Sequence, residues 1–133
     1  MREARSVRTT VGMTDVSTLA KFEVSGPDAV TLLETVCATS VGKLAVGRGR
    51  YTFMQREDGF VFDDGTVWRL EENRYLLTSS TGGADRMATH LSYVRNYLHP
   101  QLRVSVVNVQ EHYAGIAIAG QKAKSVLAKL IGE

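Results

Sequence analysis

Apolar and polar residues alternate near the start of the chain in a way that predicts a strand followed by a helix. In Ala20 to Ser25, Phe22 and Val24 alternate with charged residues, which is the period of a half-buried strand. The turn residues Gly26-Pro27-Asp28 end this strand, and Asp28 would lie near the positive end of a helix dipole. The helix that follows has apolar residues at helical spacing, namely Val30, Leu32, Leu33 and Val36.

The middle of the chain predicts consecutive antiparallel strands. We expect a hairpin in which Arg50–Met54 and Phe60–Phe62 are joined by the turn Glu57-Asp58-Gly59. Two further strands, Gly65–Leu70 and Arg74–Thr78, continue this meander. Sheet therefore dominates the middle of the chain.

The last third predicts two helices with strands between them. Apolar residues recur at steps of four and three from Ala84 to Leu98, and Pro100 ends that helix. Val104–Val109 and Gly115–Ala119 are the expected strands, and a final helix would turn inward Ala123, Val126, Leu127 and Leu130. Together the elements predict an α+β fold of ferredoxin-like type: a mostly antiparallel sheet with about three helices packed on it.

Composition limits the class of protein. The chain has 133 residues, of which 44% are hydrophobic and 23% charged, so we expect residues 1–133 to form a single soluble domain. The net charge of +2 is small and the basic residues are scattered, so nucleic acid is not implied. No apolar run approaches the roughly 18 residues that span a bilayer, and a membrane partner is not expected.

The metal-ligating and nucleophilic residues do not form a recognisable site. Cys37 is the only cysteine, which excludes an internal disulfide, agrees with a reducing, cytoplasmic compartment and favours a buried small hydrophobe. His90, His99 and His112 have no ligand spacing, so we interpret each as a satisfied surface histidine and expect no metal.

Two adjacent carboxylates, Asp63 and Asp64, lie inside the predicted hairpin region. Successive strand residues face opposite sides of a sheet, so both cannot point at solvent if one face is packed. A buried carboxylate is costly unless something pairs with it. One of the two must therefore enter a buried or pocket-lining environment.

Several segments in register resemble one known family. They are Val11–Ser17, Val24–Ala29, Gly49–Tyr51, Asp58–Arg69 and Ile116–Gly120. Together they resemble the folate-binding domain of the aminomethyltransferase family, which includes the glycine cleavage T-protein and the carboxyl-terminal region of the heterotetrameric sarcosine oxidase alpha subunit. The resemblance is greatest to the alpha subunit and covers the amino-terminal portion of the folate-binding domain.

The resemblance implies tetrahydrofolate chemistry, in which a one-carbon unit from amine oxidation is captured as methylenetetrahydrofolate. Asp64 matches the catalytic carboxylate of the family and would also contact folate, while Asp63 would be structural. Tyr51 matches a pterin-lining tyrosine, Trp68 an aromatic position that packs on the ligand or on the sheet, and Ser80 a position where the T-protein has asparagine. Flavin and NAD would belong to other domains or partner subunits.

Two hypotheses remain open at this stage. The chain is either a folate-binding part of a sarcosine oxidase or aminomethyltransferase system, or a non-catalytic interaction module that keeps the fold without the chemistry. Under the first, its partners are folate and other sarcosine oxidase-type subunits. Apolar surface left exposed would favour self-association under either hypothesis.

Overall fold

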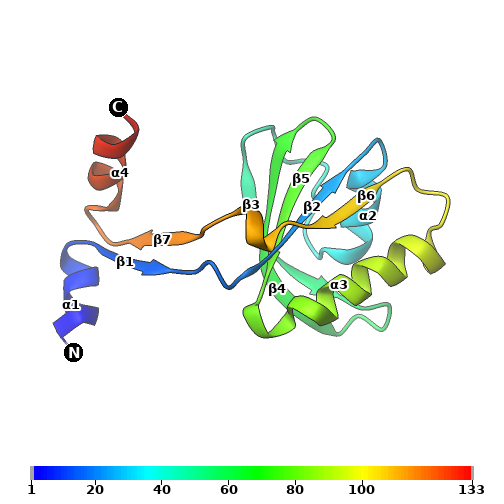
Figure 1. Ribbon diagram of the computed structural model, residues 1–133, viewed down its shortest axis with the longest axis horizontal. Helices are drawn as coiled ribbons and strands as arrows, with labels where there is room; N and C mark the ends of the chain where they lie inside the picture. Colours follow the sequence, from blue (N-terminus) through cyan, green and yellow to red (C-terminus); the bar gives the residue numbers. More distant parts are fainter. Residues whose placement is uncertain (1, 133) are drawn as a thin grey trace. The chain divides into compact units, whose positions relative to one another are not determined.

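The computed structural model describes residues 2–132, which divide into two units. The larger unit runs from Leu19 to His112, and the smaller one combines the residues up to Thr18 with those from Tyr113 onward. The chain therefore passes through the larger unit between the first and second parts of the smaller one (Figure 1).

A five-stranded antiparallel sheet forms the frame of the larger unit, with the strands in the order β3, β4, β5, β2, β6. The strands are β2 (Ala20–Ser25), β3 (Gly49–Gln55), β4 (Val61–Glu71), β5 (Arg74–Ser79) and β6 (Ser105–Asn108). Together with two helices, β2, β4, β5 and β6 follow the βαββαβ order of ferredoxin-like folds. Strand β3 is an addition at the edge beside β4.

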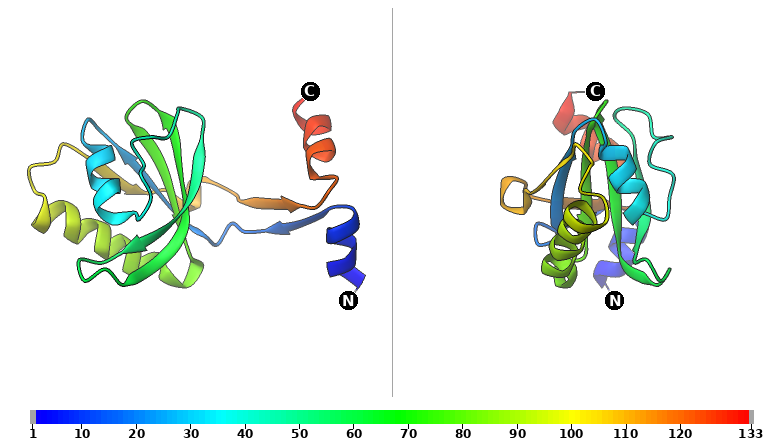
Figure 2. Two further views of the ribbon diagram at one scale, coloured as in Figure 1. Left: turned by 180° about the vertical axis from the view of Figure 1, so that it is seen from behind. Right: turned by 90° about the vertical axis from the view of Figure 1, so that its right-hand side faces the viewer.

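The two helices of the larger unit cover one face of this sheet (Figure 2). They are α2 (Ala29–Val36) and α3 (Ala84–Tyr93), and α3 continues into a π-helical turn, Val94–Leu98. The opposite face, which we call the open face, presents the alternate residues of the strands. Between helices and sheet lies a single core, whose largest fully buried side chains include Tyr75, Phe22, Leu32, Leu33, Met54, Leu77, Met87 and Leu91.

The smaller unit is built on a two-stranded antiparallel ribbon. Its elements are α1 (Arg2–Thr9), β1 (Gly12–Asp15), β7 (Ile116–Ala119) and α4 (Ala123–Ile131). In the ribbon Gly12 lies opposite Ala119 and Asp15 opposite Ile116. No described residue of α1 or α4 is buried.

The predicted α+β class with a mostly antiparallel sheet is confirmed, with two differences of detail. The described residues form four α-helices where about three were expected. The expected strand Gly65–Leu70 is the second half of one long strand, β4, which runs through Gly65 without a turn. Glycine is needed there because the neighbouring strand approaches closely: a β-carbon at position 65 would overlap the Thr78 carbonyl.

The predicted inward orientation of the last helix is wrong for its two leucines. In α4, Leu127 is 41% and Leu130 73% exposed. An amphipathic pattern identifies an apolar stripe, but it does not identify the surface that would cover the stripe.

Candidate functional site

Asp63 and Asp64 lie on opposite sides of the sheet. Asp63 is only 7% exposed, and its carboxylate lies beside Gly83 at the amino end of α3. Asp64 is exposed and lines a pocket on the open face. The prediction that one of the two carboxylates enters a buried environment is therefore confirmed, and the buried one is Asp63.

An irregularity in β4 precedes the two aspartates. Met54 on β3 pairs with Asp63, whereas the next residue, Gln55, pairs with Val61, so Phe62 is an extra residue in β4. Its ring packs against the helix-side core and lies 4.8 Å from the imidazole of His90. Such a bulge re-aims side chains locally. Regular alternation resumes after it, so Asp64 faces the open side.

A pocket of about 250 Å³ brings most of the predicted site residues together. It opens among strands β3, β4 and β5 and is lined by Leu19, Tyr51, Asp64, Gly65, Thr66, Thr78, Ser79 and Ser80. Three of the four residues expected to contact folate, Tyr51, Asp64 and Ser80, are thus lining residues. Trp68 is not among them.

Tyr51 and Asp64 form a short hydrogen bond between β3 and β4. The Tyr51 hydroxyl donates to Oδ2 of Asp64 at 2.5 Å, the short end of the range for a hydroxyl donating to a carboxylate. This bond is the main reason that the pKa of Tyr51 is raised, with burial and the charge of Asp64 adding to it. Within residues 2–132, Oδ1 of Asp64 accepts no hydrogen bond, so this residue of the pocket lining has one carboxylate oxygen available to a ligand.

Two threonine hydroxyls form the next part of the wall. Oγ1 of Thr66 and Oγ1 of Thr78 are 2.8 Å apart, and the Thr66 amide donates to the Thr78 hydroxyl at 2.9 Å. The mutual contact uses one of the two hydroxyl protons. Within the described residues, the only other acceptor for the second hydroxyl proton is the Thr66 carbonyl, which lies 3.4 Å from Oγ1 of Thr78. The two threonines can therefore donate one O–H hydrogen bond to a ligand.

Trp68 does not line the pocket, but it contacts the lining residue Thr66. Its indole Nε1 donates to Oγ1 of Thr66 at 2.9 Å, and its ring lies across β3 on Gly49, where a β-carbon would overlap it. Of the two roles expected for Trp68, the structure shows packing on the sheet. Trp68 as a whole is 44% exposed.

Ser80 lines the pocket, but its hydroxyl proton is already used. The hydroxyl donates to Oδ2 of Asp63 at 3.0 Å, and the Ser80 amide makes a longer 3.4 Å contact with Oδ1 of the same residue. Ser80 can therefore offer a ligand the lone pairs of its hydroxyl oxygen.

Sequence reasoning missed Thr66. It could have been found, because it is two residues after Asp64 on the same strand and therefore on the same face. The hydroxyl run Thr78–Thr81 suits in sequence either a polar pocket wall or a cap between strand and helix, and its first three residues line the pocket. That Thr78 contacts Thr66 depends on the register between β4 and β5, which is irregular between Arg69 and Glu71.

The prediction that His90 is a satisfied surface histidine is wrong. Among the described residues, its Nε2 is buried and has no hydrogen-bond partner. Burial is the main reason that the pKa of His90 is lowered, and a hydrogen bond to the backbone of Gln55 opposes that shift. The neutral imidazole is therefore favoured.

Cys37 is buried, as predicted. It is 4% exposed, and burial raises the pKa of its thiol to about 12. A thiol with that pKa is protonated at neutral pH and is a poor nucleophile.

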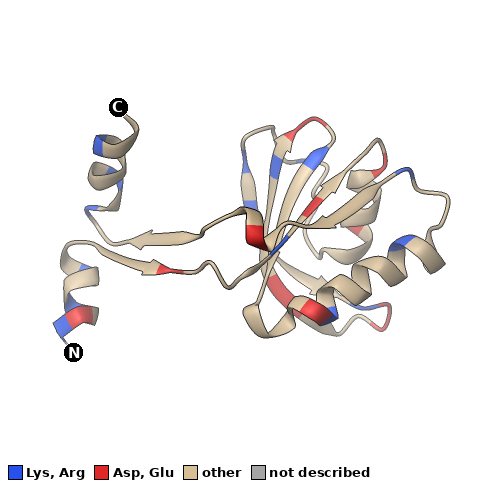
Figure 3. Ribbon diagram, viewed as in Figure 1, with Lys and Arg blue, Asp and Glu red and all other residues tan. Residues whose placement is uncertain are grey.

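Charge and metal-ligand groups add no second candidate site. Figure 3 shows Lys and Arg residues spread over helices, strands and connecting segments among acidic residues. Across residues 2–132, no group of three or more His, Cys, Asp or Glu side chains could hold a metal ion. No helix in that range is long and apolar enough to cross a membrane.

The family model and the relatives that match this chain agree with one another. The family model described as GCVT N-terminal domain matches residues 1–133. The sarcosine oxidase subunit alpha of Rhizobium meliloti is 44% identical over 132 residues, which cover 99% of this chain and 13% of that protein. The aminomethyltransferase of Exiguobacterium sibiricum is 37% identical over 128 residues, which cover 96% of this chain and 34% of that protein.

A solved structure shares the fold. The glycine cleavage system aminomethyltransferase T from Bartonella henselae superposes with a TM-score of 0.85 at 26% identity, over 96% of this chain and 34% of that one. The chain thus spans about a third or less of the length of these relatives. With the family model matching from end to end, the chain belongs to the GCVT N-terminal domain family, and its homologues are sarcosine oxidase alpha subunits and aminomethyltransferases.

Proposed function

We propose that this chain forms part of a tetrahydrofolate pocket in a sarcosine oxidase alpha subunit or an aminomethyltransferase, where a one-carbon unit from amine oxidation is captured as methylenetetrahydrofolate. The observation behind this proposal is the Asp64 carboxylate in the pocket lining, which Tyr51 holds at one oxygen while the other accepts no hydrogen bond from the described residues. The ligand class is the one that the resemblance to aminomethyltransferases implies, and membership of the family supports it.

The lining residues fit one end of such a ligand. Asp64 accepts hydrogen bonds from ring N–H groups, and the pair Thr66 and Thr78 can donate one to a ring nitrogen or carbonyl. Tyr51, 54% exposed, offers the flat surface of its ring. Pockets that enclose a whole drug-sized ligand measure roughly 300–1,000 Å³, so a pocket of about 250 Å³ fits the pterin end. The remaining contacts would come from other parts of a longer protein.

Asp64 has the central chemical role in this proposal. Tetrahydrofolate, when bound, supplies the nitrogens to which the one-carbon unit is attached. The carboxylate of Asp64 orients the ring, accepts a proton and stabilises positive charge that develops beside it. Tyr51 fixes the orientation of the carboxylate by donating to Oδ2.

We assign the oxidation of the amine to other domains or to partner subunits. Flavin and NAD would be held by other domains or by partner subunits of the sarcosine oxidase type, consistent with the alpha-subunit homologues. We propose that exposed apolar side chains form the surface for such contacts or for self-association. They include Met13, Ile116 and Leu130. We also propose a cytoplasmic location, in line with the single, buried thiol of Cys37.

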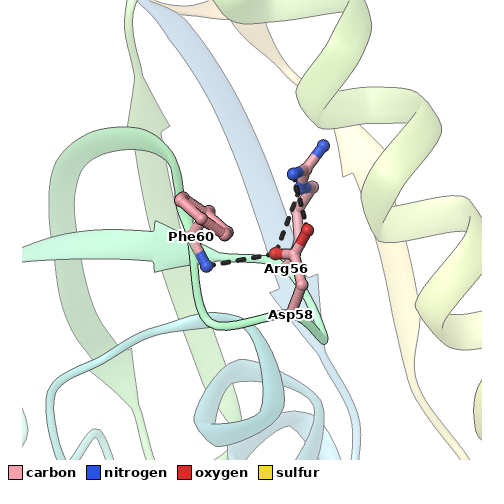
Figure 4. Close-up of polar contacts among 3 residues, drawn as sticks. All are labelled: Arg56, Asp58 and Phe60. Atoms are coloured by element: carbon pink, nitrogen blue, oxygen red, sulfur yellow. Dashed lines mark hydrogen bonds and ion pairs between the residues drawn. The ribbon is translucent and has the colours of Figure 1, made fainter.

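Calorimetric titration with tetrahydrofolate tests the proposal. We expect the full chain to bind, and Asp64→Asn to weaken binding by at least about tenfold, or about 1.4 kcal/mol. The matched control is Asp58→Asn, which changes an exposed aspartate at the turn of the same hairpin, where the carboxylate contacts Arg56 and the Phe60 amide (Figure 4). That control should bind like wild type.

Two outcomes would contradict parts of the proposal. If wild type does not bind at millimolar tetrahydrofolate, the chain has no folate site of its own, and a non-catalytic interaction module becomes the better description. If the affinity of Asp64→Asn equals that of wild type, the contact assigned to Asp64 is wrong while the folate site stands.

A further inference from the structure

Asp63 lies outside the pocket but contacts two of the residues that line it. Its Oδ1 accepts the backbone amide of Asp64 at 2.8 Å, and its Oδ2 accepts the hydroxyl of Ser80 at 3.0 Å. Asp64 belongs to β4, whereas Ser80 follows β5 and precedes α3. One buried carboxylate thus connects two walls of the pocket from the helix side of the sheet.

We propose that Asp63 is a positioning residue, which holds Asp64 and Ser80 in the arrangement that forms the pocket and thereby sets the hydrogen bond between Tyr51 and Asp64. The inference rests on the proposed function for the chemical role of Asp64. The hydrogen bond that it explains is present without any ligand.

The requirement for a carboxylate follows from the number of acceptors. Donors approach both oxygens of Asp63: backbone amides approach Oδ1 and the Ser80 hydroxyl approaches Oδ2. An asparagine has one acceptor oxygen and would turn an NH₂ group toward one of these donors. Among the described residues Asp63 has no ion-pair partner, so neutral donors and the amino end of α3 must offset the burial of its charge.

Gly83 fixes the position of Asp63 from the opposite side. A β-carbon at position 83 would overlap Oδ2 of Asp63 and lie very close to Oγ of Ser80. Gly83→Ala is therefore a change that displaces the Asp63 carboxylate while keeping its charge. It separates an effect of geometry from an effect of charge.

The ionisation of Tyr51 reports on the arrangement without folate. The pKa of Tyr51 is raised mainly because its hydroxyl donates to Asp64. It can be followed by NMR titration of the protein labelled with ¹³C at the tyrosine Cζ, with the Tyr51 signal identified by its loss in Tyr51→Phe. Asp64→Asn gives the reference value for a Tyr51 that has lost its carboxylate partner.

We expect Asp63→Ala and Gly83→Ala to lower the pKa of Tyr51 by most of the difference between wild type and the Asp64→Asn reference. Asp63→Asn, which keeps the shape and one acceptor, should give an intermediate value. Asp58→Ala, a change at the exposed turn of the same hairpin, should leave the pKa of Tyr51 as in wild type. Circular dichroism establishes that each variant is folded.

The proposal is overturned if folded Asp63→Ala and Gly83→Ala both keep the wild-type pKa of Tyr51. It is also overturned if the aspartate variants lower that pKa and Gly83→Ala does not, because the effect would then come from charge alone. Should Asp63→Ala not fold, Gly83→Ala and Asp63→Asn decide in the same way. Failure of wild type to bind tetrahydrofolate would leave this titration unchanged, so the two proposals fail separately.

Discussion

Gly65 on β4 lies against the backbone carbonyl of Thr78 on β5, so closely that a β-carbon at position 65 would overlap that oxygen. The close approach lets the amide of Thr66 reach the side-chain hydroxyl of Thr78. The same glycine also separates Asp64 from Thr66, two polar residues that line the pocket. The contact between Thr66 and Thr78 in the pocket wall therefore depends on the absence of a side chain at position 65.

Gly65→Ala is expected to destabilise the fold by about 1–3 kcal/mol, because β4 and β5 must move apart to accept the methyl group. Urea unfolding measures the effect. The control is Gly82→Ala, since nothing lies within 4 Å of a β-carbon built at position 82, and its free energy of unfolding should stay within about 0.5 kcal/mol of wild type. Equal unfolding midpoints for the two variants would contradict the close approach.

Thr78→Val is expected to cost about 1–3 kcal/mol, because the amide of Thr66 would lose its acceptor in a partly buried site. Thr78→Ser keeps the hydroxyl and should lose much less. Chemical denaturation compares the two variants. If valine, which keeps the methyl group of threonine, cost no more than serine, the hydrogen bond from the Thr66 amide would not be what stabilises this site.

The thiol of Cys37 should be unreactive toward a disulfide reagent in the native protein at pH 8 and should react at once in denaturant, because it is buried with a pKa of about 12. A thiol assay with and without urea measures this difference. Rapid reaction of the native protein would mean that the segment around Cys37 opens readily.

Cys37 also predicts a loss of stability at high pH. In the unfolded chain the thiol ionises near its ordinary pKa of 9.0, whereas in the native protein it stays protonated up to about 12. The unfolded state then binds fewer protons, so the free energy of unfolding should fall between these values by up to about 1.4 kcal/mol per pH unit. Cys37→Ala should lack this component, and tyrosine ionisation, common to both proteins, cancels in the comparison.

His90 predicts a loss of stability on the acid side. Its pKa is lowered by burial, so below pH 6.5 the unfolded chain takes up a proton that the native protein resists. The free energy of unfolding should fall as the pH drops from 7.5 to 5, and His90→Phe, whose ring can remain against Phe62, should fall less steeply. Identical pH profiles for the two proteins would show that His90 is readily protonated in the native state.

The order of strands and helices could be predicted because it depends on local patterns. The alternation of Phe22 and Val24 and the helical spacing of Met87 and Leu91 each identify a buried face, and all four residues are in the core. Local patterns could not reveal that β4 continues through Gly65. That glycine resembles a turn residue in sequence, and its role depends on the neighbouring strand.

The candidate site was predictable only in part, for a related reason. Alternation separates Asp63 from Asp64, but it does not say which of the two is buried; the bulge at Phe62 and the contact with Ser80 determine that. The orphaned Nε2 of His90 likewise depends on packing between α3 and β4, which no spacing of histidines reveals.

The pairing of β1 with β7 has a consequence for the order of folding. Hairpins such as β3–β4 and β4–β5 join strands that are close in sequence, whereas Gly12 and Ala119 lie roughly 100 positions apart. Contacts between distant segments form slowly, because the entropy of closing a long loop must be overcome first. During synthesis, β1 remains without its partner until residues 19–112 have all been made. Protection of the β1 amides from solvent exchange should therefore arise later than protection of the sheet in the larger unit.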